Sequence, residues 1–400
     1  MIEKFKTRMK YIRIDLKRLV EPENHPYISP VEYVHDPVPE APHHLANLPP
    51  LSFPQYAPAD CDFISRDSVR LNTCAAGLPY RSRLEPIRGN KYWKANLDET
   101  RKILELIAAD SSSTSMEMRN GLTLAGLAKK ELRPGLEHRM VLATSYMYPD
   151  ADERRARIIA VLMLMLFLFD VVANKEKLMN SREQFLGHFR SPNDIIPSDS
   201  VISDFERHLK LIVSAIADED KISGNGGKDI IAALLEAYRC VHPKGDFHSL
   251  EEYLSFRRLN VFAITAAKFA IKSSVDLEDA RFSRYLRLIS DHLGIANDIA
   301  SYEKESRALK EGDTQEMINV VAVFQHLESL PTIAEAKVAA YTYQLQVESW
   351  IIEEVEILAA RGDLTDEEWR FLEAVFMTAT GNVFYCMTTS RYGGDAAKLT

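Results

Sequence analysis

The chain has 400 residues, of which 46% are hydrophobic, and can therefore bury the core of one large domain or two ordinary ones. Its 58 acidic residues outnumber its 49 basic residues, for a formal net charge of −9, which argues against nucleic acid as the main partner. An anion-binding site must therefore be local, formed by a few Lys and Arg residues or by metal ions bound to carboxylates.

The N-terminal part of the chain is predicted to be irregular. Residues 1–20 are basic, but they lack the Ser-rich, acid-poor composition of a transit peptide, so we expect a surface segment. Ten of the 18 prolines fall within residues 22–58, and each proline removes a backbone donor and disfavours helix before it. We therefore predict a Pro-rich extension over residues 1–90 and a helical domain over residues 91–400.

From about residue 95 onward, apolar residues recur at helical spacing and strand-like alternation is almost absent. Gly and Pro residues separate the segments, and no repeat of fixed period is visible, so we expect one all-α domain. The Gly-rich segment 223–229 lacks the spacing of a phosphate-binding loop and predicts a connection between helices. The expected helices span residues 96–109, 114–131, 135–147, 151–180, 199–218, 228–241, 249–274, 279–307, 313–329, 332–361 and 365–391.

The longest apolar run covers residues 158–169, which is shorter than the roughly 20 residues that a membrane span needs. It predicts a buried helix, and we expect no integral membrane segment. The four cysteines lie far apart without metal-ligand spacing, as in a reduced intracellular protein, so we expect a cytoplasmic location.

Residues 297–305, with the sequence NDIASYEKE, form the strongest candidate site. Asn297, Ser301 and Glu305 are four residues apart and share one face of a helix. They offer amide, hydroxyl and carboxylate oxygens, which are the hard ligands that Mg²⁺ prefers. Lys304 lies on the same face and could donate to a phosphate group. From spacing alone, an exposed polar stripe on an ordinary helix is an equally good interpretation.

This segment closely resembles the (N/D)DxxSxxxE magnesium motif of class I terpene synthases. Two further segments also resemble that family: EGD followed by NVV within residues 311–321, and GNVFY followed by RY within residues 381–392. The resemblance covers residues 95–395. It implies a single all-α class I terpenoid synthase bundle of the microbial, fungal type, preceded by the Pro-rich arm, with the catalytic domain at residues 91–400.

The resemblance also assigns diphosphate-binding roles. By register, Arg257 would be the diphosphate sensor, with Arg258 as the competing choice and Asn260 in place of the usual linking Asp. The family's C-terminal Arg-Tyr pair corresponds to Arg391 and Tyr392, and Lys304 would join them as a donor to diphosphate oxygens.

The aspartate-rich motif of the family is degenerate in this chain. Residues 169–174, FDVVAN, stand where the family has DDxx(D/E) at the end of an apolar helix. Asp170 is kept and is expected to bridge two metal ions, because a carboxylate among apolar residues needs a partner. Val171 and Asn174 replace the acids, and Asn174 could serve as a neutral metal ligand.

The resemblance implies a lyase that uses three Mg²⁺ ions to ionise a prenyl diphosphate, most simply farnesyl diphosphate, and cyclises the cation to a sesquiterpene hydrocarbon or alcohol. The implied catalytic residues are Asp170, Arg257, Asn297, Ser301 and Glu305. An enzyme that joins the cation to an amine or water, and a non-catalytic helical interaction protein, remain alternatives. The protein is expected to be a monomer or homodimer.

Overall fold

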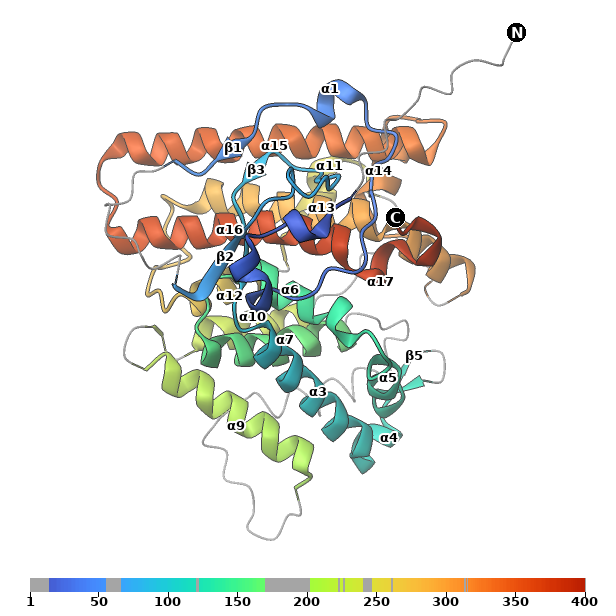
Figure 1. Ribbon diagram of the computed structural model, residues 1–400, viewed down its shortest axis with the longest axis vertical. Helices are drawn as coiled ribbons and strands as arrows, with labels where there is room; N and C mark the ends of the chain where they lie inside the picture. The colour runs from blue at the N-terminus through green and yellow to red at the C-terminus, as the bar shows by residue number, and fades with distance from the viewer. Residues whose placement is uncertain are drawn as a thin grey trace.

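A computed structural model describes most of the chain (Figure 1). The described residues are 14–54, 66–119, 122–169, 202–221, 224–225, 227–239, 247–259, 262–312, 314 and 316–399. The α-helices are α1 (His43–Ala46), α3 (Trp93–Ala109), α4 (Ser111–Ser115), α5 (Leu124–Glu131), α6 (Val141–Met147), α7 (Glu153–Phe169), α9 (Asp204–Glu219), α10 (Lys228–Arg239), α11 (Leu250–Arg257), α12 (Phe262–Ala270), α13 (Ser283–Lys310), α14 (Val320–Leu327), α15 (Ile333–Arg361), α16 (Asp366–Thr388) and α17 (Ser390–Gly393). The all-α prediction is confirmed.

Within the described residues, the strands are short and form three two-stranded ladders. β1 pairs in parallel with β3, while the β2–β4 and β5–β6 pairs are antiparallel. The strands are β1 (Leu51–Ser52), β2 (Ser68–Leu71), β3 (Leu84–Glu85), β4 (Ile87–Asn90), β5 (Glu117–Arg119) and β6 (Leu122–Thr123). Short 3₁₀ turns complete the described elements at η1 (Leu16–Arg18), η2 (Pro22–Tyr27), η3 (Leu136–His138) and η4 (Asp395–Ala397).

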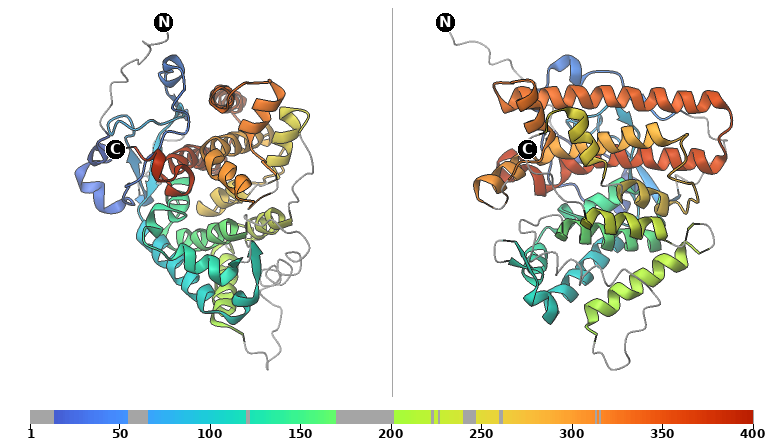
Figure 2. Two further views of the ribbon diagram at one scale, coloured as in Figure 1. Left: turned by 90° about the vertical axis from the view of Figure 1, so that its right-hand side faces the viewer. Right: turned by 180° about the vertical axis from the view of Figure 1, so that it is seen from behind.

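The long helices α13, α15 and α16 lie side by side and form one half of the molecule (Figure 1). α16 also packs against α6, which joins this half to a second one built around α3 and α7. The N-terminal segment runs along one side of the bundle, close to the C-terminal end of the chain (Figure 2). None of the helices in the described residues combines the length and apolar character that a membrane crossing requires.

Several predicted helices are shorter or divided in the structure, among them 135–147, which forms η3 and α6, and 365–391, which forms α16 and α17. The 114–131 prediction was wrong at its start, because the Ser-rich α4 ends at Ser115 and the β5–β6 ladder follows, with buried Met116 and Met118 flanking exposed Glu117. The 249–274 prediction is divided into α11 and α12. The helix predicted over residues 313–329 begins only at Val320, because Asn319 caps α14.

The described N-terminal segment, residues 14–54 (the arm), is irregular as predicted, and it packs against the helices. The backbone N–H of Leu399 donates to the carbonyl of Val34 at 2.8 Å, and the N–H of His35 donates to the carbonyl of Met387 at 3.0 Å. The arm therefore binds the C-terminal segment of the chain. The division of the chain near residue 90 stays a prediction.

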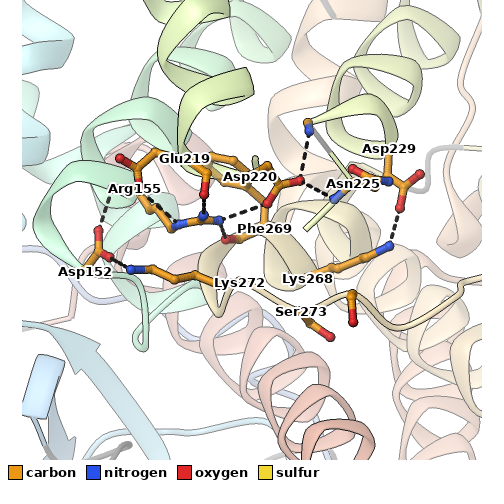
Figure 3. Close-up of polar contacts among 12 residues, drawn as sticks. Asp152, Arg155, Glu219, Asp220, Asn225, Asp229, Lys268, Phe269, Lys272 and Ser273 are labelled. Carbon is orange, nitrogen blue, oxygen red and sulfur yellow. Dashed lines mark hydrogen bonds and ion pairs between the residues drawn. The ribbon is translucent and has the colours of Figure 1, made fainter. Parts of the chain in front are cut away.

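A fully buried arginine links the start of α7 to two other helix ends (Figure 3). The Arg155 guanidinium donates to the backbone carbonyls of Glu219 and Phe269, and its Nη1 lies 3.4 Å from Oδ1 of Asp220. Its Cζ lies 4.4 Å from the centroid of the Phe269 ring, a cation–π contact. A buried charge is tolerated only when it is paired and hydrogen-bonded in this way.

The connection between α9 and α10 is organised by the same network. Oδ2 of Asp220 accepts hydrogen bonds from the backbone N–H groups of Asn225, at 3.1 Å, and Gly227, at 2.9 Å (Figure 3). These N–H groups are thus bound by a carboxylate of the same chain. The described residues of segment 223–229 therefore form a connection between helices, as predicted.

We expect Arg155→Ala to lower the free energy of unfolding by about 3–5 kcal/mol, because it removes the cation beside the buried Asp220 carboxylate and leaves two carbonyls without their donor. Arg154→Ala is the matched control, since Arg154 is exposed and pairs with Glu219 at the surface, where the loss should be below about 1 kcal/mol. Urea denaturation of the three proteins measures both values. Equal losses would contradict the role assigned to Arg155.

Candidate functional site

The central helix α13 places Asn297, Ser301 and Glu305 on one face, and we call these three residues the oxygen-donor stripe. Ser301 Oγ donates to Oε1 of Glu305 at 2.6 Å, so two members of the stripe are in direct contact. Asn297 Nδ2 donates to the Tyr392 hydroxyl oxygen at 2.7 Å. This bond uses the amide nitrogen and leaves the amide oxygen as the atom suited to a cation.

The C-terminal segment supplies the cationic and aromatic side of the site. Tyr392, on α17, is buried against α13, and Nζ of Lys304 lies 5.7 Å from the centroid of its ring. The Arg391 guanidinium lies over the Phe167 ring at 5.1 Å, which places it near the described end of α7. The structure therefore brings Lys304, Arg391 and Tyr392 to the C-terminal half of α13, while their diphosphate-binding role stays a prediction.

The two candidate sensor arginines have different partners. Arg257, at the end of α11, forms an ion pair with Asp298 on α13, with Nη2 and Oδ1 2.8 Å apart, and 26% of its side chain is exposed. Arg258 forms ion pairs with Asp291, Nε to Oδ1 at 2.6 Å, and with Glu251. Only Arg257 is connected to the helical turn that carries the stripe.

Asp298 was not among the sequence candidates, yet it is the most buried acid next to the stripe. Its carboxylate accepts hydrogen bonds from the Tyr253 hydroxyl and from the backbone N–H of Val320, at 3.1 Å, and pairs with Arg257. Burial raises the pKa of Asp298 to about 6, although the nearby Arg257 charge opposes that rise. The (N/D)DxxSxxxE motif includes this Asp, but its partners come from other helices and appear only in the structure.

Most of the degenerate aspartate motif, residues 169–174, lies outside the described residues. α7 is described up to Phe169, and Asp170, Val171 and Asn174 lie outside the described residues. Among the described residues, no group of three His, Cys, Asp or Glu side chains could hold a metal. The stripe contributes one carboxylate, one hydroxyl and one amide oxygen, a donor set whose hardness fits Mg²⁺ completed by waters and phosphate.

Comparison with known proteins agrees with this geometry. Residues 227–341 match the family described as terpene synthase family 2, C-terminal metal binding. Over 328 residues the chain is 25% identical to terpene cyclase 6 of Gibberella fujikuroi, a match that covers 79% of this chain and 82% of that protein.

Two solved structures share the fold. Germacradien-4-ol synthase from Streptomyces citricolor has a TM-score of 0.52 and 16% identity, covering 75% of this chain and 95% of that one. A point variant of cucumene synthase has a TM-score of 0.50 and 16% identity, covering 67% of this chain and 93% of that one.

The sequence and the fold of this chain are similar to those of terpene synthases. The resemblance drawn from residues 297–305 is thereby confirmed, and so is the class I terpene synthase fold. The matched metal-binding region contains the whole oxygen-donor stripe together with Arg257. The comparisons thus support an enzyme of the terpene synthase type with a metal-binding region, while the roles of individual residues stay predictions.

The Gly381–Asn382 pair has a packing role that explains its place in the sequence pattern. A Cβ added at Gly381 would lie 1.8 Å from the carbonyl oxygen of Tyr146, because α16 crosses α6 there in close contact. Asn382 Nδ2 donates to the carbonyl of Leu293 at 3.1 Å and so ties α16 to α13.

We expect Gly381→Ala to destabilise the protein by on the order of 3 kcal/mol, because two helix backbones would have to separate. Gly126→Ala, in α5, is the control: its nearest neighbour would be Thr123 Oγ1 at 3.4 Å, an ordinary contact, so stability should be kept or slightly raised. Thermal unfolding followed by circular dichroism compares the two. A tolerated Gly381→Ala would show that α16 and α6 can part without cost.

Proposed function

We propose that this chain is a magnesium-dependent class I terpene synthase that ionises a prenyl diphosphate and cyclises the resulting carbocation. Farnesyl diphosphate is the proposed substrate, and a sesquiterpene hydrocarbon or alcohol is the proposed product. The observation that carries the proposal is the convergence of α11, α13 and α17, which brings Arg257, the oxygen-donor stripe and Tyr392 to one region.

Asn297, Ser301 and Glu305 would hold the metal ions on one side, with Asp170 and Asn174 as the proposed ligands on the other. Three ions are the proposed complement. When bound, Mg²⁺ neutralises the diphosphate and makes it a good leaving group. Of the stripe, Glu305 would contribute the full negative charge, and Ser301, already hydrogen-bonded to it, the adjacent neutral oxygen.

The cationic side chains would bind the diphosphate itself. Arg257 and Arg391 offer planar guanidinium groups suited to phosphate oxygens, and Lys304 and the Tyr392 hydroxyl offer single donors. Donors fixed before the reaction stabilise the charge that develops on the departing diphosphate. Arg257 is held in advance by its ion pair with Asp298.

Aromatic side chains lie beside these donors and would shield the carbocation. Phe167 and Tyr385 have ring centroids 6.2 Å apart, and Tyr385 and Tyr392 have centroids 5.7 Å apart. Such faces attract positive charge and exclude water, which would otherwise quench the cation.

The first test is incubation of the purified protein with farnesyl diphosphate, with and without Mg²⁺. We expect magnesium-dependent diphosphate release and a cyclic product by gas chromatography–mass spectrometry, and neither with Glu305→Gln, which lacks the charged ligand. Release without a cyclic product would favour transfer of the prenyl cation to an amine or water, the alternative suggested by Val171 and Asn174. No release with any prenyl diphosphate would contradict the proposal.

Arg257→Gln and Arg258→Gln form a matched pair for the diphosphate role. We expect Arg257→Gln to lower kcat/KM by about 10²-fold or more, the usual cost of losing one positioned donor to developing charge. Both variants should lower the melting temperature, since each leaves a buried acid, Asp298 or Asp291, without its arginine, but Arg258→Gln should keep kcat/KM within about threefold. The reverse pattern would transfer the sensor role to Arg258.

A further inference from the structure

A buried amide connects the oxygen-donor stripe to the start of α14. Asn319 has no exposed surface, and its side chain makes three hydrogen bonds. Nδ2 donates to the backbone carbonyl of Asp298 at 2.8 Å and to Oε2 of Glu305 at 2.9 Å, while Oδ1 accepts from the backbone N–H of Val321 at 2.9 Å. Both N–H donors of the amide are therefore used, and each points to α13.

These contacts restrict the Glu305 carboxylate. Oε1 receives the Ser301 hydroxyl at 2.6 Å and Oε2 receives the Asn319 amide at 2.9 Å, so each oxygen has a fixed donor. A glutamate side chain has about 1.5–2 kcal/mol of rotamer freedom to lose, and two opposed donors remove that freedom before any ligand arrives. Hydrogen bonds of this kind orient carboxylates that bind metals.

Val320, the residue that follows Asn319, contacts the acid that pairs with Arg257. The backbone N–H of Val320 donates to Oδ2 of Asp298 at 3.1 Å, and Oδ1 of Asp298 pairs with Arg257 at 2.8 Å. At the start of α14, Asn319 thus contacts Glu305 of the stripe, and Val320 contacts Asp298, which pairs with Arg257. Their placement depends on the cap of α14, which Asn319 also provides.

We propose that Asn319 is a positioning residue for the metal site: its amide fixes the Glu305 carboxylate in the orientation that binds the metal. The inference rests on the proposed function, because the metal role of Glu305 belongs to that proposal. Asn319 itself does not bind the metal, since its two N–H groups and its carbonyl oxygen are all bound within the protein.

Asn319→Ser tests this role while keeping the cap of α14. Serine is as good a helix cap as asparagine, but its hydroxyl is too short to span to Glu305, so the fold is kept and the donor is lost. Asn319→Thr, a bulkier capping residue, is the second variant should the first fail to fold. Thr365→Ala, which removes a helix cap from α16, controls for lost stability alone.

The measurement is binding of Mn²⁺ in the presence of inorganic diphosphate, followed by electron paramagnetic resonance, with a melting curve of each metal-free protein. We expect Mn²⁺ affinity to fall about 10–100-fold in Asn319→Ser, the usual effect of removing a residue that orients a metal ligand. Thr365→Ala should keep the wild-type affinity. Excess Mg²⁺ should restore turnover to Asn319→Ser but not to Glu305→Gln.

The outcomes separate the inference from the proposed function. Wild-type affinity in folded Asn319→Ser would overturn the positioning role and leave the proposed function standing. Weakened binding in Thr365→Ala to the same degree would assign the effect to stability and also overturn it. A wild-type protein that binds no Mn²⁺ with diphosphate would overturn the metal site and, with it, the inference.

Discussion

The Asp298 carboxylate is buried inside the bundle and is bound by the Tyr253 hydroxyl, the Arg257 guanidinium and the N–H of Val320. An ionised carboxylate in such a place is stable only when its partners are all present. Those partners come from α11 and from the first turn of α14. The hydrogen bonds and the ion pair of Asp298 therefore fix how α11 and α14 pack against α13. The oxygen-donor stripe lies on α13, which both of the other helices contact.

The stripe occupies a demanding position because α13 is also a core helix, packed against α15 and α16. Its buried face carries residues such as Ile295 and Ile299, while the stripe lies on the opposite face, where its polar side chains must keep a fixed orientation. The Asn297 amide donates to the Tyr392 hydroxyl, and the Glu305 carboxylate accepts from Ser301 and Asn319, and these hydrogen bonds supply that orientation. The arm adds a further restraint, since it binds backbone groups of the C-terminal segment on either side of Tyr392.

The sequence was sufficient for features that depend on local periodicity. Helical spacing predicted the main helices, and the four-residue intervals predicted that Asn297, Ser301 and Glu305 share a face. Features that depend on contacts between distant segments were not predictable. Three arginines precede the apolar run of α7, and nothing in their order shows that Arg155 is the buried one. Likewise, the distinction between Arg257 and Arg258 appears only when α11 is placed against α13.

The buried contacts of Arg155 have a geometric consequence for the opposite end of α7. A helix behaves as a stiff rod with a rise of about 1.5 Å per residue, so Phe169 lies about 21 Å along the axis from Arg155. Fixing one end of the helix limits its translation and its rotation. The contacts of Arg155 therefore also restrict the position of Phe169 at the other end of α7. Substitutions around Arg155, Asp220 and Phe269 therefore act on the neighbourhood of Phe167 from a distance, through the length of α7, without any change beside Phe167 itself.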